Sequence, residues 1–275
     1  MIDFQLVSPE FVAEYLGDPE AEVHWKLLEA HFTSPDHPSA SDQDDSLHIK
    51  GAIKVHPSYL EAGTDRSKYY PAYKHPADGN LLPDRELARA LQRLGITPDT
   101  LVIVYGREPD GTMAAEPTSP WRTRPELLVS TEEVREISKA TGMITSKLVD
   151  VRGRGEWDGS LTHHYPFFSK AGHIPTAEFQ GDWENLVDKN THKLGPMLDT
   201  VGKRWRKLGI IDSGVSPSRT TLIFYCGTGW RSSIAFLVAL LLGVRAKNYD
   251  SGFYGWSWNE ENEIAMGNSA LQEAS

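Results

Sequence analysis

Short apolar runs alternate along the chain with stretches of helical periodicity. Residues 101–105 (Leu-Val-Ile-Val-Tyr) and 222–225 (Leu-Ile-Phe-Tyr) have the length and composition of buried strands. Helical stretches lie between such runs, and this alternation is typical of a central, mainly parallel sheet flanked by helices. The pattern therefore predicts an α/β fold.

The second of these runs leads into a glycine loop and then a further helix. Gly227 and Gly229 end the predicted strand, because glycine permits the tight turn that other residues resist. In the apolar segment that follows, Ser232 or Ser233 marks the expected start of a helix and Gly243 its end. The segment is therefore predicted to form a strand, a tight loop and a helix.

The two halves of the chain are weakly similar to each other. Four segments recur in the same order, namely 8–12 as 130–134, 48–53 as 171–177, 94–98 as 208–212, and 101–105 as 222–226. Self-similarity of this kind predicts two copies of one α/β unit.

The first copy is predicted to be shortened after its last matching strand. Only 24 residues lie between Tyr105 and Ser130, too few for the helix, strand and second helix expected after residue 226. Three prolines within residues 117–125 also exclude a helix interior there. We therefore expect a shortened N-terminal domain over residues 1–115, a linker over 116–129 and a C-terminal domain over 130–275.

Cys226 is the only cysteine among the 275 residues, and it lies at the predicted junction of strand and helix. The first backbone N–H groups of a helix are unpaired and carry the positive end of the helix dipole. Together with the nearby Arg231, they favour the thiolate over the thiol. Cys226 is therefore predicted to be a catalytic nucleophile, and a small, inert core residue is the alternative. Gly106 stands at the matching position of the first copy, which is predicted to be inactive.

Four motifs of the second half, in order, resemble those of the rhodanese superfamily in its tandem-domain sulfurtransferase form. They are Asp150-Val-Arg152 with Glu156 and Gly159 downstream, Gly172-His-Ile-Pro-Thr-Ala177, Cys226-Gly-Thr-Gly-Trp-Arg231, and the segment Asn248 to Trp256. Thr176 replaces the second glycine of the family motif Gly-His-Ile-Pro-Gly-Ala. The last segment reads Tyr-Asp-Ser-Gly where the family usually reads Leu-Asp-Gly-Gly. The resemblance covers nearly the whole chain and is most specific in the second half.

The resemblance implies transfer of sulfane sulfur from a small-molecule donor to a thiol or cyanide acceptor, with no cofactor. Cys226 would attack thiosulfate, mercaptopyruvate or polysulfide, hold the outer sulfur as a persulfide and then pass it on. Backbone N–H groups of the loop would stabilise the anionic persulfide. The residues expected to bind the persulfide or the substrate are Gly227, Thr228, Gly229, Trp230, Arg231 and Arg152.

The loop sequence leaves the donor open. Loops of the mercaptopyruvate branch usually read Cys-Gly-Ser-Gly-Val-Thr, and the thiosulfate branch usually has a basic residue after the cysteine. The present Gly-Thr-Gly-Trp-Arg sequence resembles rhodanese-like proteins that accept polysulfide, including the ergothioneine-forming type. A thiosulfate-type sulfurtransferase is the first expectation.

The cysteine loop has two other interpretations. Phosphatases and arsenate reductases also surround an anion with a cysteine and an arginine, but their signature has five residues between the two. Four residues separate Cys226 from Arg231, and the shorter loop suits one sulfur atom better than a tetrahedral oxyanion. A non-catalytic, regulatory rhodanese-like module is the second alternative, which the shortened first copy favours and the intact cysteine loop opposes.

Arg152 has two possible roles, as a substrate-binding cation or as the partner of Asp150 or Glu156 in a structural ion pair. The pocket is expected at the carboxyl end of the strand that precedes Cys226. Aromatic residues are expected either at its mouth or in the core, and these are Trp230, Phe253, Tyr254 and Trp256.

The charge and composition of the chain limit the classes of partner that it is expected to bind. The net charge of −10 argues against nucleic acid or an anionic membrane, and the apolar run 234–242 is too short to span a bilayer. His173, His163 and His164 lack carboxylates or thiols at ligand spacing, so no metal site is expected. The first residues lack the features of a signal or transit peptide, and a single cysteine allows no internal disulfide. We expect a cytoplasmic protein with small-molecule substrates, and its oligomeric state stays open.

Overall fold

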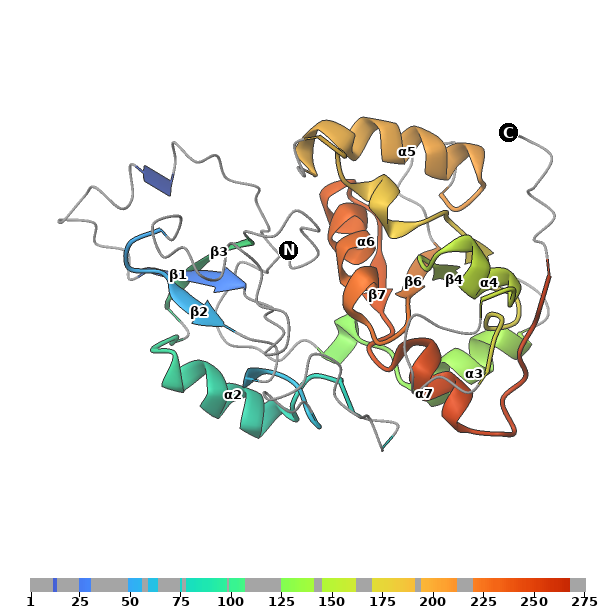
Figure 1. Ribbon diagram of the computed structural model, residues 1–275, viewed down its shortest axis with the longest axis horizontal. Helices are drawn as coiled ribbons and strands as arrows, with labels where there is room; N and C mark the ends of the chain where they lie inside the picture. Colours follow the sequence, from blue (N-terminus) through green and yellow to red (C-terminus); the bar gives the residue numbers. More distant parts are fainter. Residues whose placement is uncertain are drawn as a thin grey trace. The chain divides into compact units, whose positions relative to one another are not determined.

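The computed structural model divides the chain into two compact units (Figure 1). It describes residues 12–13, 25–30, 49–55, 59–63, 75, 78–97, 99–106, 125–140, 145–161, 170–190, 194–211 and 220–267. The second unit contains the described residues from 125 onward together with 61–63, 75 and 78–81, and the first unit contains the others. A short part of the first half of the sequence thus belongs to the second unit.

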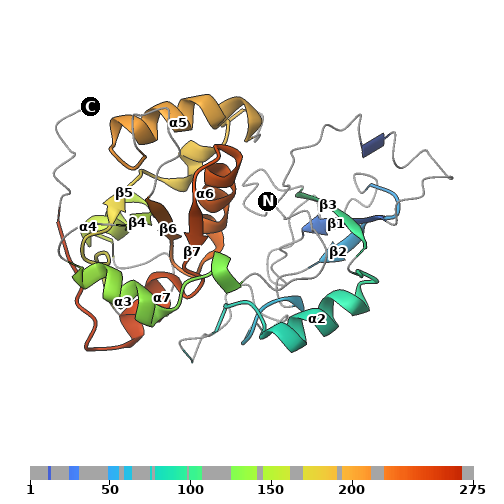
Figure 2. The same cartoon turned by 180° about the vertical axis from the view of Figure 1, so that it is seen from behind.

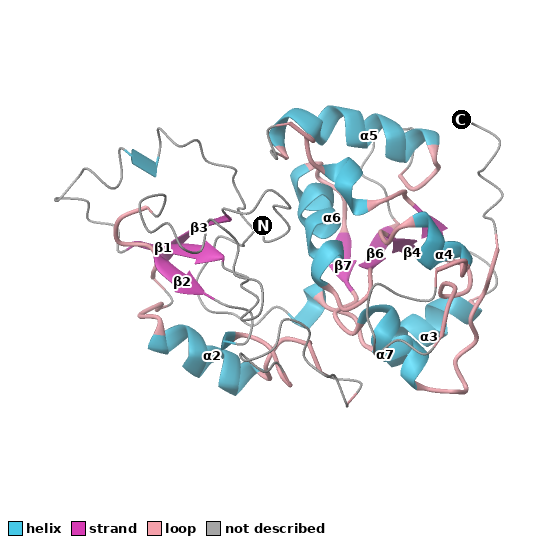
Figure 3. Cartoon of the chain, viewed as in Figure 1, coloured by secondary structure: helices cyan, strands magenta, loops and turns pink. Residues whose placement is uncertain are grey.

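The first unit is built on a parallel sheet with the strand order β2-β1-β3 (Figure 3). Its described elements are β1 (Trp25–Ala30), β2 (Ile53–Val55), α2 (Asp84–Arg93) and β3 (Leu101–Gly106). Its buried apolar cluster consists of Leu28, Val55, Ile96 and Val102.

The second unit is built on a parallel sheet with the order β5-β4-β6-β7. The strands are β4 (Ser146–Asp150), β5 (Glu178–Phe179), β6 (Thr221–Tyr225) and β7 (Ala246–Asn248). The helices are α3 (Thr131–Lys139), α4 (Arg154–Asp158), α5 (Leu198–Lys207), α6 (Trp230–Leu241) and α7 (Gly252–Trp258). Short 3₁₀ turns η4 (Pro125–Leu127), η5 (Trp183–Leu186) and η6 (Gly195–Met197) complete the unit. The predicted α/β fold, with parallel sheets flanked by helices, is confirmed.

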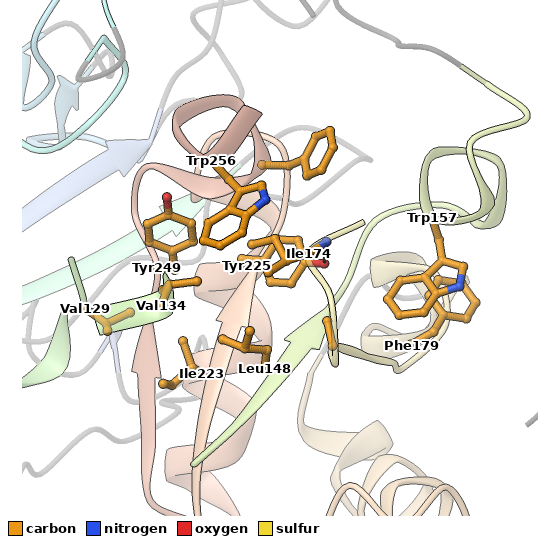
Figure 4. Close-up of a cluster of buried hydrophobic side chains, with 12 residues drawn as sticks. Val129, Val134, Leu148, Trp157, Ile174, Phe179, Ile223, Tyr225, Tyr249 and Trp256 are labelled. Carbon is orange, nitrogen blue, oxygen red and sulfur yellow. Dashed lines mark hydrogen bonds between the residues drawn. The ribbon is translucent and has the colours of Figure 1, made fainter. Parts of the chain in front are cut away.

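Helices cover both faces of the second sheet, with α5 and α6 on one side and α3 and α7 on the other (Figures 1 and 2). Side chains of β6 alternate between these faces, as the period of a strand requires. Phe224 packs against Trp205 of α5, with ring centroids 5.3 Å apart. Ile223 and Tyr225 point the other way, into the cluster that also contains Trp256 of α7 (Figure 4). Burial on both faces explains why the strand is an uninterrupted apolar run.

Tyr105 and Tyr225 occupy matching places in the two units, so the predicted alignment of residues 101–105 with 222–226 is shifted by one position. Tyr105 on β3 pairs in register with Glu29 on β1, and Tyr225 on β6 pairs in register with Asp150 on β4. In both units the acidic residue is buried, and the tyrosine hydroxyl accepts a hydrogen bond of 3.2 Å from a backbone N–H. The two units therefore share this arrangement of tyrosine, carboxylate and backbone N–H.

The turn that supplies this N–H is also alike in the two units. The donors are Ile49 and Ile174, and two residues later the chain takes a positive φ, 90° at Gly51 and 66° at Thr176. Thr176 is the one non-glycine residue with a positive φ among those the structure describes. The repeat itself and the shortening of its first copy stay predictions.

The helix after the glycine loop begins earlier than predicted. The sequence placed its start at Ser232 or Ser233, but α6 begins at Trp230 with Gly229 as its N-cap. The serine hydroxyls instead bond to carbonyls three residues back, in the first turn of the helix. The predicted end at Gly243 is confirmed, since the helix ends at Leu241 and Gly243 has a φ of 71°. In the described part of the chain, no helix combines the length and the hydrophobicity needed to cross a membrane.

Candidate functional site

Cys226 directly follows β6, at the carboxyl edge of the second sheet, and is only 1% exposed. Gly227, Thr228 and Gly229 connect it to the first residue of α6, and all three are buried. The loop is therefore enclosed by the fold, as expected for a site at the carboxyl end of a parallel strand.

The first carbonyl groups of the loop bond to the start of α7. The backbone N–H of Phe253 donates to the carbonyl oxygen of Cys226 at 2.8 Å, and that of Tyr254 donates to Gly227 at 2.9 Å. A Cβ atom on Gly252 would lie 2.5 Å from the Gly227 oxygen, so the approach of α7 requires glycine there.

The carbonyl of Gly229 is also occupied. It accepts hydrogen bonds from the Ser232 hydroxyl at 2.9 Å and from Asn248 Nδ2 at 3.2 Å. Gly229 has a φ of 84°, and a Cβ atom there would lie 2.5 Å from the backbone oxygen of Asp250. Both the conformation and the contact restrict this position to glycine.

The N–H groups of the loop contrast with its carbonyls. Within the part of the chain that the structure describes, the backbone N–H groups of Gly227, Thr228 and Gly229 donate no hydrogen bond. Buried N–H groups are nearly always paired in proteins, and a run of unpaired ones in a glycine loop is typical of an anion-binding nest. The loop can therefore solvate an anion beside Cys226.

Arg231 forms a bidentate ion pair with Glu156 of α4. Its Nη1 and Nη2 donate to the two carboxylate oxygens at 2.7 and 2.9 Å, and the two side chains are 13% and 3% exposed. Burial opposes ionisation of Glu156, but the hydrogen bonds and charge of Arg231 outweigh it and hold the pKa of Glu156 below its ordinary value. The predicted anion-binding arginine is thus held by a carboxylate.

Arg152 is paired as well. Its partner is Asp150, as in the structural ion pair that was one of its two expected roles. Its guanidinium bonds to the Asp150 carboxylate at 2.7 to 3.0 Å and donates to the carbonyl of Gly172 at 2.7 Å. Burial opposes its charge, but Asp150 overcomes this and raises the pKa of Arg152. The ring of Phe253 lies 4.1 Å from the guanidinium carbon. Arg152 therefore joins β4, α7 and the segment around Gly172.

The aromatic residues after β7 belong to the core. Phe253, Tyr254 and Trp256 are 1%, 2% and 1% exposed, and Figure 4 shows Trp256 beside Tyr249 within the buried cluster. Trp230 is partly buried at the start of α6. The alternative that placed these aromatic residues in the core therefore fits three of the four.

His173 has a structural setting. It stacks on Trp157 with ring centroids 3.6 Å apart, and its Nδ1 lies 2.9 Å from the Trp157 carbonyl oxygen. Burial lowers the pKa of His173. His163 and His164 lie outside the described residues.

Asp250 is a site residue that sequence reasoning missed. It follows β7, and its Oδ1 would lie 2.9 Å from a Cβ atom on Gly229. Its Oδ2 accepts a hydrogen bond of 2.8 Å from the backbone N–H of Leu81. A signal was present, because Asp250 occupies the aspartate position of the Leu-Asp-Gly-Gly motif that the segment resembles.

Comparison with known proteins identifies the relatives of this chain. Residues 130–258 match the rhodanese-like domain family. The chain is 24% identical over 314 residues to the thiosulfate sulfurtransferase YnjE of Escherichia coli, covering 96% of this chain but only 65% of that protein. It is 26% identical over 305 residues to the sulfur carrier protein TtuD of Thermus thermophilus, covering 91% of this chain and 93% of that protein.

Solved structures similar to this chain include an ergothioneine biosynthesis enzyme and a protein bound to ergothioneine. One is the anaerobic ergothioneine biosynthesis enzyme of Chlorobium limicola with trimethyl histidine, with a TM-score of 0.73 and 25% identity over 96% of this chain and 70% of that one. Another is a variant of EanB that carries a cysteine persulfide, solved with ergothioneine. Its TM-score is 0.73 and its identity 25%, over 96% of this chain and 71% of that one.

Proposed function

Because residues 130–258 of this chain form a rhodanese-like domain, we propose that the protein is a sulfurtransferase with Cys226 as its nucleophile. The relationship to rhodanese-like sulfurtransferases predicted from the four motifs is confirmed. The proposed reaction moves sulfane sulfur from a small donor, with thiosulfate as the first candidate, to a thiol or cyanide acceptor.

The observation that carries this proposal is the polarity of the Cys226 loop. Its carbonyl oxygens at Cys226, Gly227 and Gly229 are occupied by α6, α7 and β7, whereas no described group accepts from the N–H groups of Gly227, Thr228 and Gly229. Such a loop stabilises negative charge next to the sulfur atom. A persulfide carries its negative charge on the outer sulfur atom bonded to Cys226, and it is the species a sulfurtransferase must hold.

The proposed reaction has two displacement steps. The Cys226 thiolate attacks the outer sulfur of thiosulfate, a new S–S bond forms, and the old S–S bond breaks with its electron pair leaving on sulfite. The acceptor then attacks the outer sulfur of the persulfide, and the electron pair of that S–S bond returns to Cys226 as thiolate. With cyanide the second product is thiocyanate. Each step is a thiolate-type exchange at divalent sulfur and needs no further oxidant.

Arg152 and Arg231 support the loop in this proposal through their ion pairs. Arg231 lies in the first turn of α6 and is fixed by Glu156, while Arg152 is fixed by Asp150 next to α7. We propose that both arginines position the loop and contribute to its electrostatic potential. Trp230 and Thr228 complete the proposed binding surface.

Whole-protein mass spectrometry tests the proposal directly, because the chain has one cysteine. The protein is incubated with thiosulfate, polysulfide or mercaptopyruvate, and a gain of one sulfur atom is expected that cyanide removes. Cys226→Ser is the matched control and should gain nothing. An unmodified wild-type protein with all three donors would contradict the proposal.

A second candidate within the same chemistry is polysulfide-dependent transfer to trimethyl histidine. It is favoured by the likeness of the fold to the Chlorobium limicola enzyme and to EanB and by the Gly-Thr-Gly-Trp-Arg loop. Adding trimethyl histidine to the persulfide form tests it, with ergothioneine as the expected product. Release of sulfur to cyanide but not to trimethyl histidine would rule out the second candidate and retain the first.

We further propose that residues 130–275 are the catalytic domain, residues 1–115 an inactive one, and 116–129 their linker. The cytoplasmic location stays a prediction.

A further inference from the structure

The carboxyl group of Asp250 packs directly on the Cys226 loop. Its Oδ1 would be 2.9 Å from a Cβ atom on Gly229, and its backbone oxygen would be 2.5 Å from that atom. The next residues, from Gly252 to Tyr254, contact the carbonyls of Cys226 and Gly227. The turn after β7 therefore lies against the loop along its whole length.

Residues 80 and 81, which belong to the second unit, hold this turn in place. The backbone N–H of Leu81 donates to Asp250 Oδ2 at 2.8 Å, and Asn80 Nδ2 donates to the Ser251 hydroxyl at 2.9 Å. Both bonds join positions about 170 residues apart in sequence. The orientation of the Asp250 carboxyl is thus fixed from the side away from Gly229.

Among the described residues, no cation forms an ion pair with Asp250, whereas the two arginines near the loop are both paired. Arg231 is neutralised by Glu156 and Arg152 by Asp150. The other titratable or charged groups on the elements packed against it are Glu61, Asp78, Tyr254, Cys226, Arg231 and Lys247. Lys247 lies 3.8 Å from Glu133, and burial, together with the charge of Asp78, raises the pKa of Tyr254 to about 12.

We infer that Asp250 sets the donor preference of the site, because its negative charge beside Gly229 opposes the binding of dianionic donors more than that of monoanionic ones. The inference rests on the proposed function of the loop as the persulfide cradle. Thiosulfate is a dianion, whereas mercaptopyruvate and hydropolysulfide are monoanions. The repulsion grows in proportion to the charge of the ligand, so it separates these donors.

The same carboxyl makes this preference depend on pH. Burial raises the pKa of Asp250 to about 6, against the opposing effect of the Leu81 N–H. The group is therefore charged at pH 7.5 and largely neutral at pH 5, where its repulsion of a dianion is reduced.

The test measures anion binding rather than turnover, in a Cys226→Ser background that prevents sulfur transfer. Calorimetry compares thiosulfate with thiocyanate, a monoanion, at pH 7.5 and at pH 5. Adding Asp250→Asn is expected to tighten thiosulfate binding at pH 7.5 by roughly threefold to tenfold, and thiocyanate binding by less. At pH 5 the ratio of the thiosulfate affinities with and without Asp250→Asn should fall toward one. Asp199→Asn, which removes an exposed charge on α5, is the matched control and should change neither.

Equal gains for the two anions, no gain, a gain of the same size at both pH values, or no binding of either anion would overturn the inference. Failure of the proposed function is a different result, namely no persulfide on the wild-type protein from any donor. Asp250→Asn in the otherwise unchanged protein should also raise the ratio of kcat/KM for thiosulfate to that for mercaptopyruvate.

Discussion

Replacing Asp250 by asparagine should change the pH dependence of stability in a defined direction. Burial raises the pKa of Asp250 from 3.8 to about 6 in the folded protein, which means that the fold favours the neutral carboxyl. The corresponding stabilisation is fully present below pH 4 and is lost as the pH rises through 6. A shift of this size corresponds to about 3 kcal/mol, so the wild-type protein should lose up to about 3 kcal/mol between pH 4 and pH 7.5 from this group alone. Asparagine keeps an oxygen that can accept from Leu81 and has no charge to lose.

Urea unfolding at pH 4, 6 and 7.5 measures this difference. Tryptophan fluorescence reports on the second unit through the fully buried Trp157, Trp205 and Trp256. The gain in unfolding free energy of Asp250→Asn over wild type should be near zero at pH 4 and largest at pH 7.5, while Asp199→Asn should show no such trend. A difference between Asp250→Asn and wild type that stays constant across the three pH values would refute the reasoning.

Three further experiments probe separate features of the second unit. Thr176→Gly should raise the free energy of unfolding by about 0.5–1 kcal/mol in chemical denaturation, because glycine adopts the positive φ of 66° without strain. The larger entropy of glycine in the unfolded chain cancels only part of this gain. Thr176→Ala keeps the strain and should show no such gain. Asn80→Ala and Ser251→Ala should each weaken persulfide formation, and in a double-mutant cycle their effects should couple by about 0.5–1.5 kcal/mol; strict additivity would contradict the contact. Glu156→Gln should lower the unfolding free energy by about 2–4 kcal/mol, because Arg231 loses its buried counter-charge. The same change should lower KM for thiosulfate, because Arg231 is no longer neutralised by Glu156. An unchanged KM would contradict this.

Local patterns predicted the strand, loop and helix around Cys226 because each step is determined by adjacent residues. The apolar run gives β6, the glycines give the loop, and Gly243 ends α6. The capping box at Ser130 is determined locally in the same way. The start of α6 was missed by two residues, because Gly229 acts as its N-cap without any side-chain bond that a sequence pattern could reveal.

Contacts between distant positions could not be read from the sequence. Arg231 and Glu156 are 75 residues apart, and Leu81 and Asp250 are 169 apart. Both candidate partners of Arg152 were named in advance, but only the three-dimensional register of β4 decides that Asp150 is the one it contacts. The electrostatic balance of the loop depends on these pairings, so the sequence could propose the arginines as anion ligands but could not show that carboxylates already hold them.

The presence of a single thiol, buried at the end of β6, has a consequence for how a sulfur atom would leave the protein. In many redox proteins a second cysteine of the same chain attacks the modified one and closes a disulfide. These 275 residues contain no such second cysteine. A persulfide on Cys226 would therefore meet no second thiol within these residues, and its lifetime would depend on the arrival of another nucleophile. The same enclosure that leaves Cys226 1% exposed would slow the approach of that nucleophile and so lengthen the lifetime of a persulfide.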